Sequence, residues 1–197
     1  MLTSINPLGE RGRGHRWGVT MAWLFVGHLV GGLGLGALMA VGAGILDAIT
    51  DGQADDPWRA VVAVVAAVAA ATFDLAGGRV PGRRQVDERW LTSYRGWVYG
   101  LGFGAQLGFG LVTVINSALL FAMILAGVLA GPVAAVAIGV VHGATRAVLA
   151  LANGRVRSVD DLKSLHRRLD GTEQRVRIGV PVVMLGAAAS ITIGGLT

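Results

Sequence analysis

The chain has 197 residues, of which 53% are hydrophobic and only 15% are charged, and its mean hydropathy is +0.62. A water-soluble domain of this length cannot bury so much apolar surface, so the composition indicates an integral membrane protein whose main partner is the lipid bilayer. The absence of cysteine excludes disulfides, thiolate metal sites and iron–sulfur clusters within the chain, and the net charge of +5 does not by itself indicate nucleic acid, which is not an expected partner.

Five apolar runs approach or exceed the length of about 20 helical residues that crosses a hydrocarbon core of about 30 Å. They are residues 17–46, 58–76, 96–127, 133–151 and 178–196. The sequence therefore predicts an all-α fold, a polytopic transmembrane helix bundle of about five spans, with six as the alternative. Residues 1–197 are expected to form a single transmembrane domain, because no segment between the runs is long enough to fold separately.

Basic residues gather on one side of the predicted bundle. Arginines precede the first run, and residues 77–95 and 152–177 form basic loops after the second and fourth runs. The opposite side receives acidic residues, namely Asp47, Asp51, Asp55 and Asp56. The positive-inside rule then predicts a multi-pass protein of the cell (cytoplasmic) membrane with a cytoplasmic N-terminus, cytoplasmic basic loops and an external C-terminus. The first run is too long for a signal-peptide core and is expected to be retained.

Each basic loop is expected to contain an amphipathic helix on the membrane surface. In the first loop, apolar residues recur at helical spacing among charged ones: Val86, Trp90, Leu91, Tyr94 and Trp97. In the second loop, Ser158 would cap a helix that begins at Val159, with Asp161 at its third position. The alternative is a pair of solvated charged loops.

Short stretches of the two halves resemble each other. Residues 75–80 read LAGGRV and residues 151–156 read LANGRV, while LGLG at 33–36 resembles LGFG at 107–110. Each unit would contain two spans and a basic surface helix. Because an even number of spans separates the copies, they would run parallel, unless low sequence complexity alone explains the similarity.

Six polar residues in the apolar runs are the candidates for a solute or ion path: His28, Asp74, Gln106, Asn116, His142 and Arg146. At about 1.5 Å per residue, His28, Gln106 and His142 fall near the bilayer midplane. Asp74 and Arg146 are expected to pair, because an uncompensated charge in a span costs at least ~2.5 kcal/mol. The alternative is that Arg146 reaches the headgroups and that Asp74 caps backbone near Gly77.

The two histidines on separate spans, His28 and His142, also allow a b-type haem or a metal ion, since imidazole binds both. No further ligand pattern accompanies them. The expectation is therefore that the chain carries no cofactor and that these side chains hydrogen-bond helices together.

Glycines four residues apart predict close helix packing in the first and third runs. The sets are Gly27/Gly31, Gly32/Gly36, Gly100/Gly104 and Gly104/Gly108. Such faces bring backbones together within one chain, in a homo-oligomer or against a partner in a membrane complex. Both runs exceed one straight crossing, so tilt, protrusion or a break near the midplane must absorb the excess, and broken helices are typical of transporters.

Residues 90–110 (WLTSYRGWVYGLGFGAQLGFG) and 139–146 (GVVHGATR) resemble the cytochrome c biogenesis transmembrane (CcdA/DsbD-like) branch of the LysE-type exporter superfamily. The resemblance implies a compact bundle with interrupted helices that moves reducing equivalents, ions or small metabolites. Electron-carrying members depend on a cysteine in each half, and this chain has none. A disulfide relay is thereby excluded, and five spans with parallel copies also differ from an inverted three-plus-three design.

Taken together, these features predict a small polytopic inner-membrane protein that is transporter- or exporter-like, with a polar midplane site for a small solute or ion. One alternative is a non-catalytic accessory or structural subunit of a membrane complex. Another is a b-type haem-binding membrane protein. Enzymatic activity is not expected, because no nucleophile and base recur at a catalytic spacing.

Overall fold

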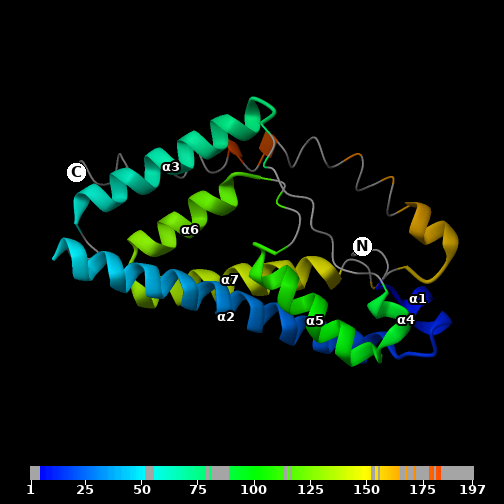
Figure 1. The fold of residues 1–197 in the computed structure, drawn as a ribbon. Helices are drawn as coiled ribbons and strands as arrows, with labels where there is room; N and C mark the ends of the chain where they lie inside the picture. Colours follow the sequence, from blue (N-terminus) through cyan, green and yellow to red (C-terminus); the bar gives the residue numbers. More distant parts are fainter. Residues whose placement is uncertain are drawn as a thin grey trace. The chain divides into compact units, whose positions relative to one another are not determined.

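The structure is a computed structural model that describes residues 5–51, 56–78, 80, 89–112, 115, 117–151, 154, 156–164, 167, 171, 178–179 and 181–182. Its regular elements are helices (Figure 1), in the order α1 (Pro7–Gly12), α2 (Trp17–Thr50), α3 (Pro57–Leu75), α4 (Trp90–Ser93), α5 (Gly96–Phe109), α6 (Leu119–Leu129) and α7 (Pro132–Ala150). Residues 159–164 are also helical. The described part of the chain is thus all-α, as the apolar runs predict.

Three helices, α2, α3 and α7, are long and apolar enough to cross a membrane, with 34, 19 and 19 residues. Their bounds lie within one residue of the predicted ones, except that α2 continues to Thr50. They expose large apolar side chains such as Val41, Val65 and Leu149, which are 62%, 60% and 66% exposed. Outward apolar faces on three such helices are those of a multi-pass membrane protein. Of the expected span 178–196, only residues 178, 179, 181 and 182 lie among the described ones.

The first and third apolar runs, which are longer than one straight membrane crossing, differ in whether the helix is broken. The first forms one uninterrupted helix, α2, of 34 residues. The expected third span, residues 96–127, is not one helix: it is divided between α5 and α6. Gly110 has a φ of 77°, a conformation that favours glycine, and its N–H reaches the Gln106 carbonyl at 3.2 Å. The break therefore sits at a glycine that ends α5.

The expected surface helix of the first basic loop is also interrupted. Only α4, of four residues, precedes α5, and residues 86–88 lie outside the described part of the chain. Tyr94 is extended, with φ −125° and ψ 160°, so Trp97 belongs to α5 and not to one stripe with Trp90. At this turn α5 packs closely on α2, because a methyl group at Gly96 would lie 2.5 Å from the Thr20 hydroxyl oxygen.

The cap expected in the second basic loop is present. The Asp161 N–H donates to the Ser158 hydroxyl at 3.1 Å, and the Ser158 N–H donates to the Asp161 carboxylate at 2.9 Å. This reciprocal pair satisfies two amides that the first turn of a helix leaves without partners. The short helix 159–164 starts where this capping box predicts.

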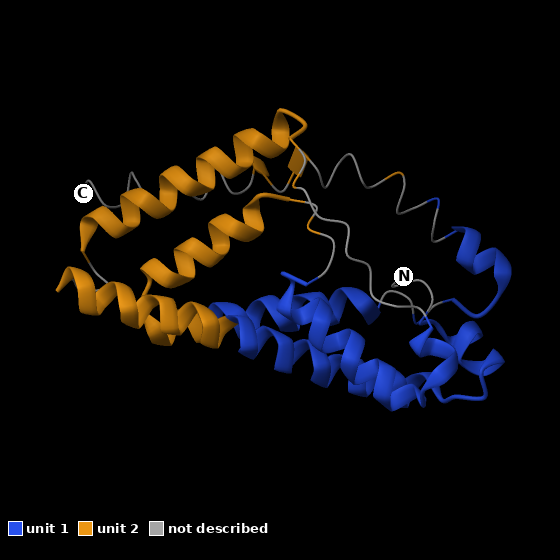
Figure 2. Cartoon of the chain, viewed as in Figure 1, with its two compact units in different colours: residues 1–35, 83–114, 138–170 blue, residues 36–82, 115–137, 171–197 orange. Residues whose placement is uncertain are grey.

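The chain divides into two compact units (Figure 2). Unit 1 comprises residues 1–35, 83–114 and 138–170, and unit 2 comprises residues 36–82, 115–137 and 171–197, so that α2 and α7 contribute to both. The core of unit 1 is formed by Ile5, Met21, Leu24, Leu91, Tyr99, Phe103 and Ala150. In unit 2, α6 packs against α3.

In unit 1, glycines hold α2 and α5 at backbone contact. A methyl group at Gly104 would lie 2.9 Å from the Gly27 α-carbon, and one at Gly108 would lie 2.7 Å from the His28 α-carbon. Contacts of Gly100 with Thr20 and of Gly104 with Leu24 show that α2 and α5 run parallel. A parallel first and third span is expected from the predicted order of spans alone, so the internal similarity between the halves stays a prediction.

On its neighbouring face, α2 packs against α7 in the same way. A methyl group at Gly32 would lie 2.9 Å from the Gly143 α-carbon, and in unit 2 one at Gly36 would lie 2.9 Å from the Val136 α-carbon. Gly32 and Gly36 belong to the predicted contact glycines, whereas Gly139 and Gly143, which have the same spacing on α7, do not. Two adjacent glycine rows on α2 therefore contact different helices: Gly27 and Gly31 contact α5, and Gly32 and Gly36 contact α7.

Candidate functional site

His28 lies where α2 meets both α5 and α7. Its side chain is 1% exposed, and methyl groups at Gly108 on α5 and Gly143 on α7 would both collide with its carbonyl oxygen. Its Nδ1 lies 2.8 Å from the Leu24 carbonyl oxygen. Because a carbonyl only accepts, Nδ1 carries the proton of this hydrogen bond, and in the neutral ring Nε2 is left as an acceptor. The imidazole is therefore fixed in tautomer and orientation.

His142 and Arg146 stand on α7 beside this crossing. They are one helical turn apart, on either side of Gly143 in the sequence, and they interact electrostatically with each other and with His28. The His142 Nε2 atom is buried without a hydrogen-bond partner among the described residues. Within unit 1, Arg146 makes no hydrogen bond or ion pair with a described residue. Three basic groups thus lie close together in unit 1, and no described carboxylate pairs with Arg146.

Gln106 belongs to the same unit and the same level. It lies on α5 between Gly104 and Gly108, the glycines that contact the α2 backbone around His28. It is half-buried, and its neighbour Ala105 contacts Gly31 of α2. Asn116 lies outside the described residues. Of the predicted path residues, the structure therefore places His28, His142, Arg146 and Gln106 in unit 1.

Asp74 belongs to unit 2, where it caps α6. Its carboxylate accepts hydrogen bonds from the Ser117 hydroxyl at 2.5 Å and from the Ala118 N–H at 2.9 Å. A carboxylate at a helix N-terminus is stabilised by the orphan amides and by the helix dipole. The carboxylate therefore has partners that do not involve Arg146, and the expected Asp74–Arg146 pair stays a prediction. Backbone capping, the alternative, is what Asp74 does, but at α6 and not at Gly77.

Arg59, at the opposite end of α3, was not singled out by the sequence analysis. Its side chain is 1% exposed, and its Nη2 lies 2.7 Å from an Asp47 carboxylate oxygen. Nη1 donates to the Leu129 carbonyl at 3.4 Å, and the guanidinium lies over the Trp58 ring. This arginine on the acidic side of the bundle is therefore neutralised within unit 2, where it joins α2, α3 and the end of α6.

A second polar cluster that the sequence analysis missed surrounds Glu10 in unit 1. Glu10 is fully buried, and its carboxylate accepts hydrogen bonds from Tyr99, Thr20 and Arg13, each at 2.6 Å. His15 lies 3.1 Å from the Tyr99 hydroxyl. These bonds attach α1 to α2 and α5. The only local signal was the Asn6-Pro7 start of α1, where Asn6 caps the Gly9 N–H at 2.8 Å.

The described residues contain no group of three or more His, Cys, Asp or Glu side chains that could hold a metal ion. A bis-histidine haem would require the porphyrin to lie between His28 and His142. Gly143, next to His142, already meets the His28 backbone. This contact leaves little space for a macrocycle and disfavours the haem interpretation.

A comparison with protein-family models found no match, and neither did comparisons with curated proteins or with solved structures. The likeness to the cytochrome c biogenesis branch of the exporter superfamily therefore stays a prediction. What is established is the class: a small all-α protein with three candidate membrane-spanning helices.

Proposed function

We propose that this protein is a transporter-like membrane protein that binds a small anionic solute at Arg146, His142 and His28. One observation carries the proposal: the His142 Nε2 atom is buried without a hydrogen-bond partner among the described residues, one turn from Arg146. A buried polar atom without a partner costs about 1–3 kcal/mol. An unpaired charge in a span costs at least ~2.5 kcal/mol. A bound anion would offset both costs.

The groups at this site suit an anion better than a cation. Arg146 offers donors only, His142 offers a ring nitrogen, and the described part of unit 1 supplies no carboxylate beside them. The tautomer of His28 that donates to Leu24 leaves Nε2 as an acceptor, which can accept a hydrogen bond from an O–H group of a partly protonated anion such as phosphate. The break between α5 and α6 supports a transporter-like scaffold, since interrupted helices expose backbone to a solute.

The test uses purified protein, first in detergent and then in vesicles. Thermal stabilisation by chloride, phosphate, acetate and succinate is measured, and flux of any stabilising anion is followed between about pH 5 and 8, where imidazole titrates. Arg146→Gln, His142→Leu and Gln106→Leu should abolish flux and leave folding nearly intact. Thr145→Val is the matched control, because Thr145 is exposed beside Arg146 and bonds only its own helix at 2.8 Å. Unchanged flux in all variants, or no stabilising anion, would refute the site.

The proposed orientation has a cytoplasmic N-terminus and an external C-terminus. It rests on the one-sided arginines and on the parallel course of α2 and α5, which both begin after arginines, Arg16 and Arg95. A reporter fused after Asp51 or at Thr197 should read as external, and one near Arg83 or Lys163 as cytoplasmic. An internal signal at Thr197 would mean that the scheme contains a false span or lacks one, as in the six-span alternative.

A second candidate function is that of an accessory subunit in a membrane complex. The glycine contacts of α2 with α5 and α7 favour it, because they join the helices at backbone distance as in a rigid scaffold. The partner, or a second copy, would then contact the outward apolar faces. Purification in mild detergent distinguishes the two, since a subunit should keep a defined partner and show no flux.

A further inference from the structure

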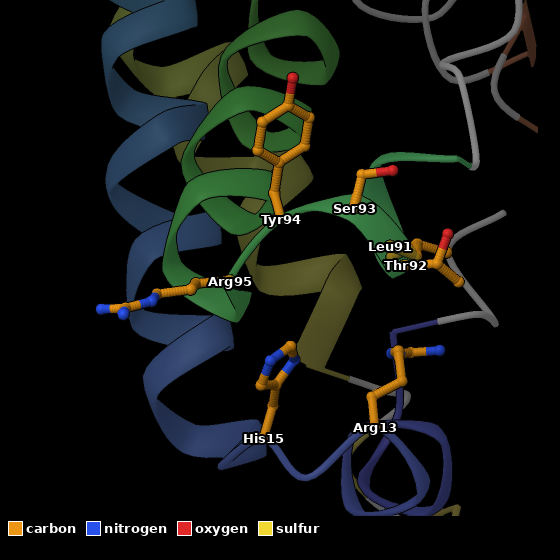
Figure 3. Close-up of a pocket in the computed structure, with 7 residues that line it drawn as sticks. All are labelled: Arg13, His15, Leu91, Thr92, Ser93, Tyr94 and Arg95. Carbon is orange, nitrogen blue, oxygen red and sulfur yellow. The ribbon is translucent and has the colours of Figure 1, made fainter.

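A surface pocket of about 380 Å³ opens at the arginine-bearing end of unit 1, away from His28 and Arg146. It is lined by Arg13, His15, Leu91, Thr92, Ser93, Tyr94 and Arg95 (Figure 3). The volume falls within the ~300–1,000 Å³ that is usual for small-molecule sites. The pocket lies between the turn that precedes α2 and the turn between α4 and α5.

The described residues of the lining carry positive charge and hydroxyl groups but no acid. Arg13 and His15 come from one side, and Thr92 and Ser93 from the other, with Arg95 at the rim and its guanidinium directed outward (Figure 3). Among the described residues, the fully buried Glu10 contacts Arg13 at 2.6 Å and lies 4.0 Å from His15. Its hydrogen bond to Arg13 fixes the position of that guanidinium. Cations and hydroxyls in one concave surface are the groups that recognise phosphate.

Aromatic side chains surround the same end of unit 1. Trp90 packs on Tyr94 and Phe103, with ring centroids 5.4 and 5.9 Å apart. Trp23 and Trp97 pair at 5.8 Å, and both are more than one-third exposed, at 39% and 44%. Exposed tryptophans of this kind mark the level of lipid headgroups. The pocket therefore lies where a phosphate would belong to the membrane itself.

We propose that this pocket binds the phosphate of an anionic phospholipid headgroup. Arg13, His15 and Ser93 line the phosphate site, Arg95 adds positive charge at the rim, and Leu91 and the aromatic rings lie toward the glycerol and acyl chains. Basic pockets on one side of helical membrane proteins bind anionic lipids in this manner. The site is independent of the solute site proposed above, so either can fail without the other.

The experiment titrates the purified protein in detergent with short-chain phosphatidylglycerol, short-chain phosphatidylcholine or inorganic phosphate. Phosphatidylglycerol should bind at least about fivefold more tightly than phosphatidylcholine, since each arginine near the surface contributes about that factor for anionic lipid. Arg95→Gln should weaken phosphatidylglycerol binding about fivefold, and Ser93→Ala should weaken it less. Neither side chain belongs to the Glu10 cluster, so folding should be retained.

Arg16→Gln is the matched control, because Arg16 is exposed, has the same charge and does not line the pocket. It should change binding less than about twofold. If Arg95→Gln and Arg16→Gln weaken phosphatidylglycerol binding equally, or if both lipids bind equally, the attraction is a diffuse one to the whole surface. Either result would overturn the proposal that the pocket is the binding site. Binding of inorganic phosphate that phosphatidylglycerol does not displace would overturn the lipid as the source.

Discussion

The Tyr99 hydroxyl lies 2.6 Å from each carboxylate oxygen of Glu10, a residue 89 positions earlier in the chain. Both side chains are fully buried. A carboxylate in such a place is tolerated only when its oxygens are satisfied, and here a tyrosine, a threonine and an arginine do so. The contact fixes α1 against the start of α5, directly beneath the proposed lipid pocket.

Replacing Tyr99 by Phe should lower the free energy of unfolding by about 1–2 kcal/mol, because Glu10 loses one buried donor while the ring volume is kept. Unfolding is measured thermally or with denaturant in detergent. Tyr94→Phe is the control, since Tyr94 is 50% exposed and makes no contact with Glu10. Equal stability of the two variants would show that the buried hydrogen bond has no net effect.

The bond between Asp74 and Ser117 gives a second prediction. Asp74→Ala should lower the free energy of unfolding by about 1–2 kcal/mol through loss of the α6 cap. Ser117→Ala should add little to that loss, so the double-mutant cycle should give a coupling of at least ~0.5 kcal/mol. Thr72→Val should combine additively with Asp74→Ala, because Thr72 is exposed and bonds only Val68. A coupling of Asp74 with Arg146 larger than that with Ser117 would instead support the pair predicted from the sequence.

Local pattern was sufficient to predict much of the fold. Apolar length predicted both ends of α3 and α7 and the start of α2 to within one residue. The Ser158–Asp161 cap and the glycine faces depend on spacing within one segment. Each of these features is decided by a few neighbouring residues in the chain. The break of the third run at Gly110 was left open, because several glycines there could have adopted the positive φ that only one of them has.

The polar clusters could not be predicted, because they depend on contacts between residues far apart in the sequence. Glu10 is an acid in a basic segment, and Arg59 is an arginine beside an acidic one. Both read as surface residues until α1 is packed against α2 and α5, and α3 against the end of α6. Asp74 was recognised as a buried charge, but its partners at Ser117 and Ala118 follow only from the break that starts a new helix there. Long-range contacts, not residue types, decide these roles.

Asp161 should show a pH dependence in the second basic loop. Its pKa is lowered from the usual value by hydrogen bonds with Ser158 and from the Arg157 N–H. A lowered pKa in the folded state means that the ionised form stabilises the cap above the unfolded pKa of about 3.9, and that this contribution is lost as the pH falls through the folded pKa. NMR titration should find the carboxyl pKa below ~3.9, and Ser158→Ala should raise it. An unchanged pKa in that variant would exclude Ser158 as the cause.

A graded series of glycine replacements tests the packing that places His28 beside His142 and Arg146. At Gly44 of α2, an added methyl group would enter open space. At Gly34, it would meet the Phe109 side chain at an ordinary 3.5 Å. At Gly143 of α7, it would lie 3.1 Å from the Gly32 α-carbon and would collide with the His28 carbonyl oxygen. Backbone atoms cannot rotate away as a side chain can. Overpacking of this kind costs about 1–3 kcal/mol.

Alanine itself favours the helix over glycine by about 1 kcal/mol, and this gain is the same at all three positions. Gly44→Ala and Gly34→Ala should therefore be neutral or stabilising, and Gly143→Ala should be destabilising in thermal unfolding measured in detergent. Because a displaced α7 also moves Arg146 from His28, only Gly143→Ala should abolish stabilisation by the anion that binds the wild-type protein. If Gly143→Ala unfolds like Gly44→Ala and still responds to the anion, then α2 and α7 are not in backbone contact at His28, and the proposed site loses its geometric basis.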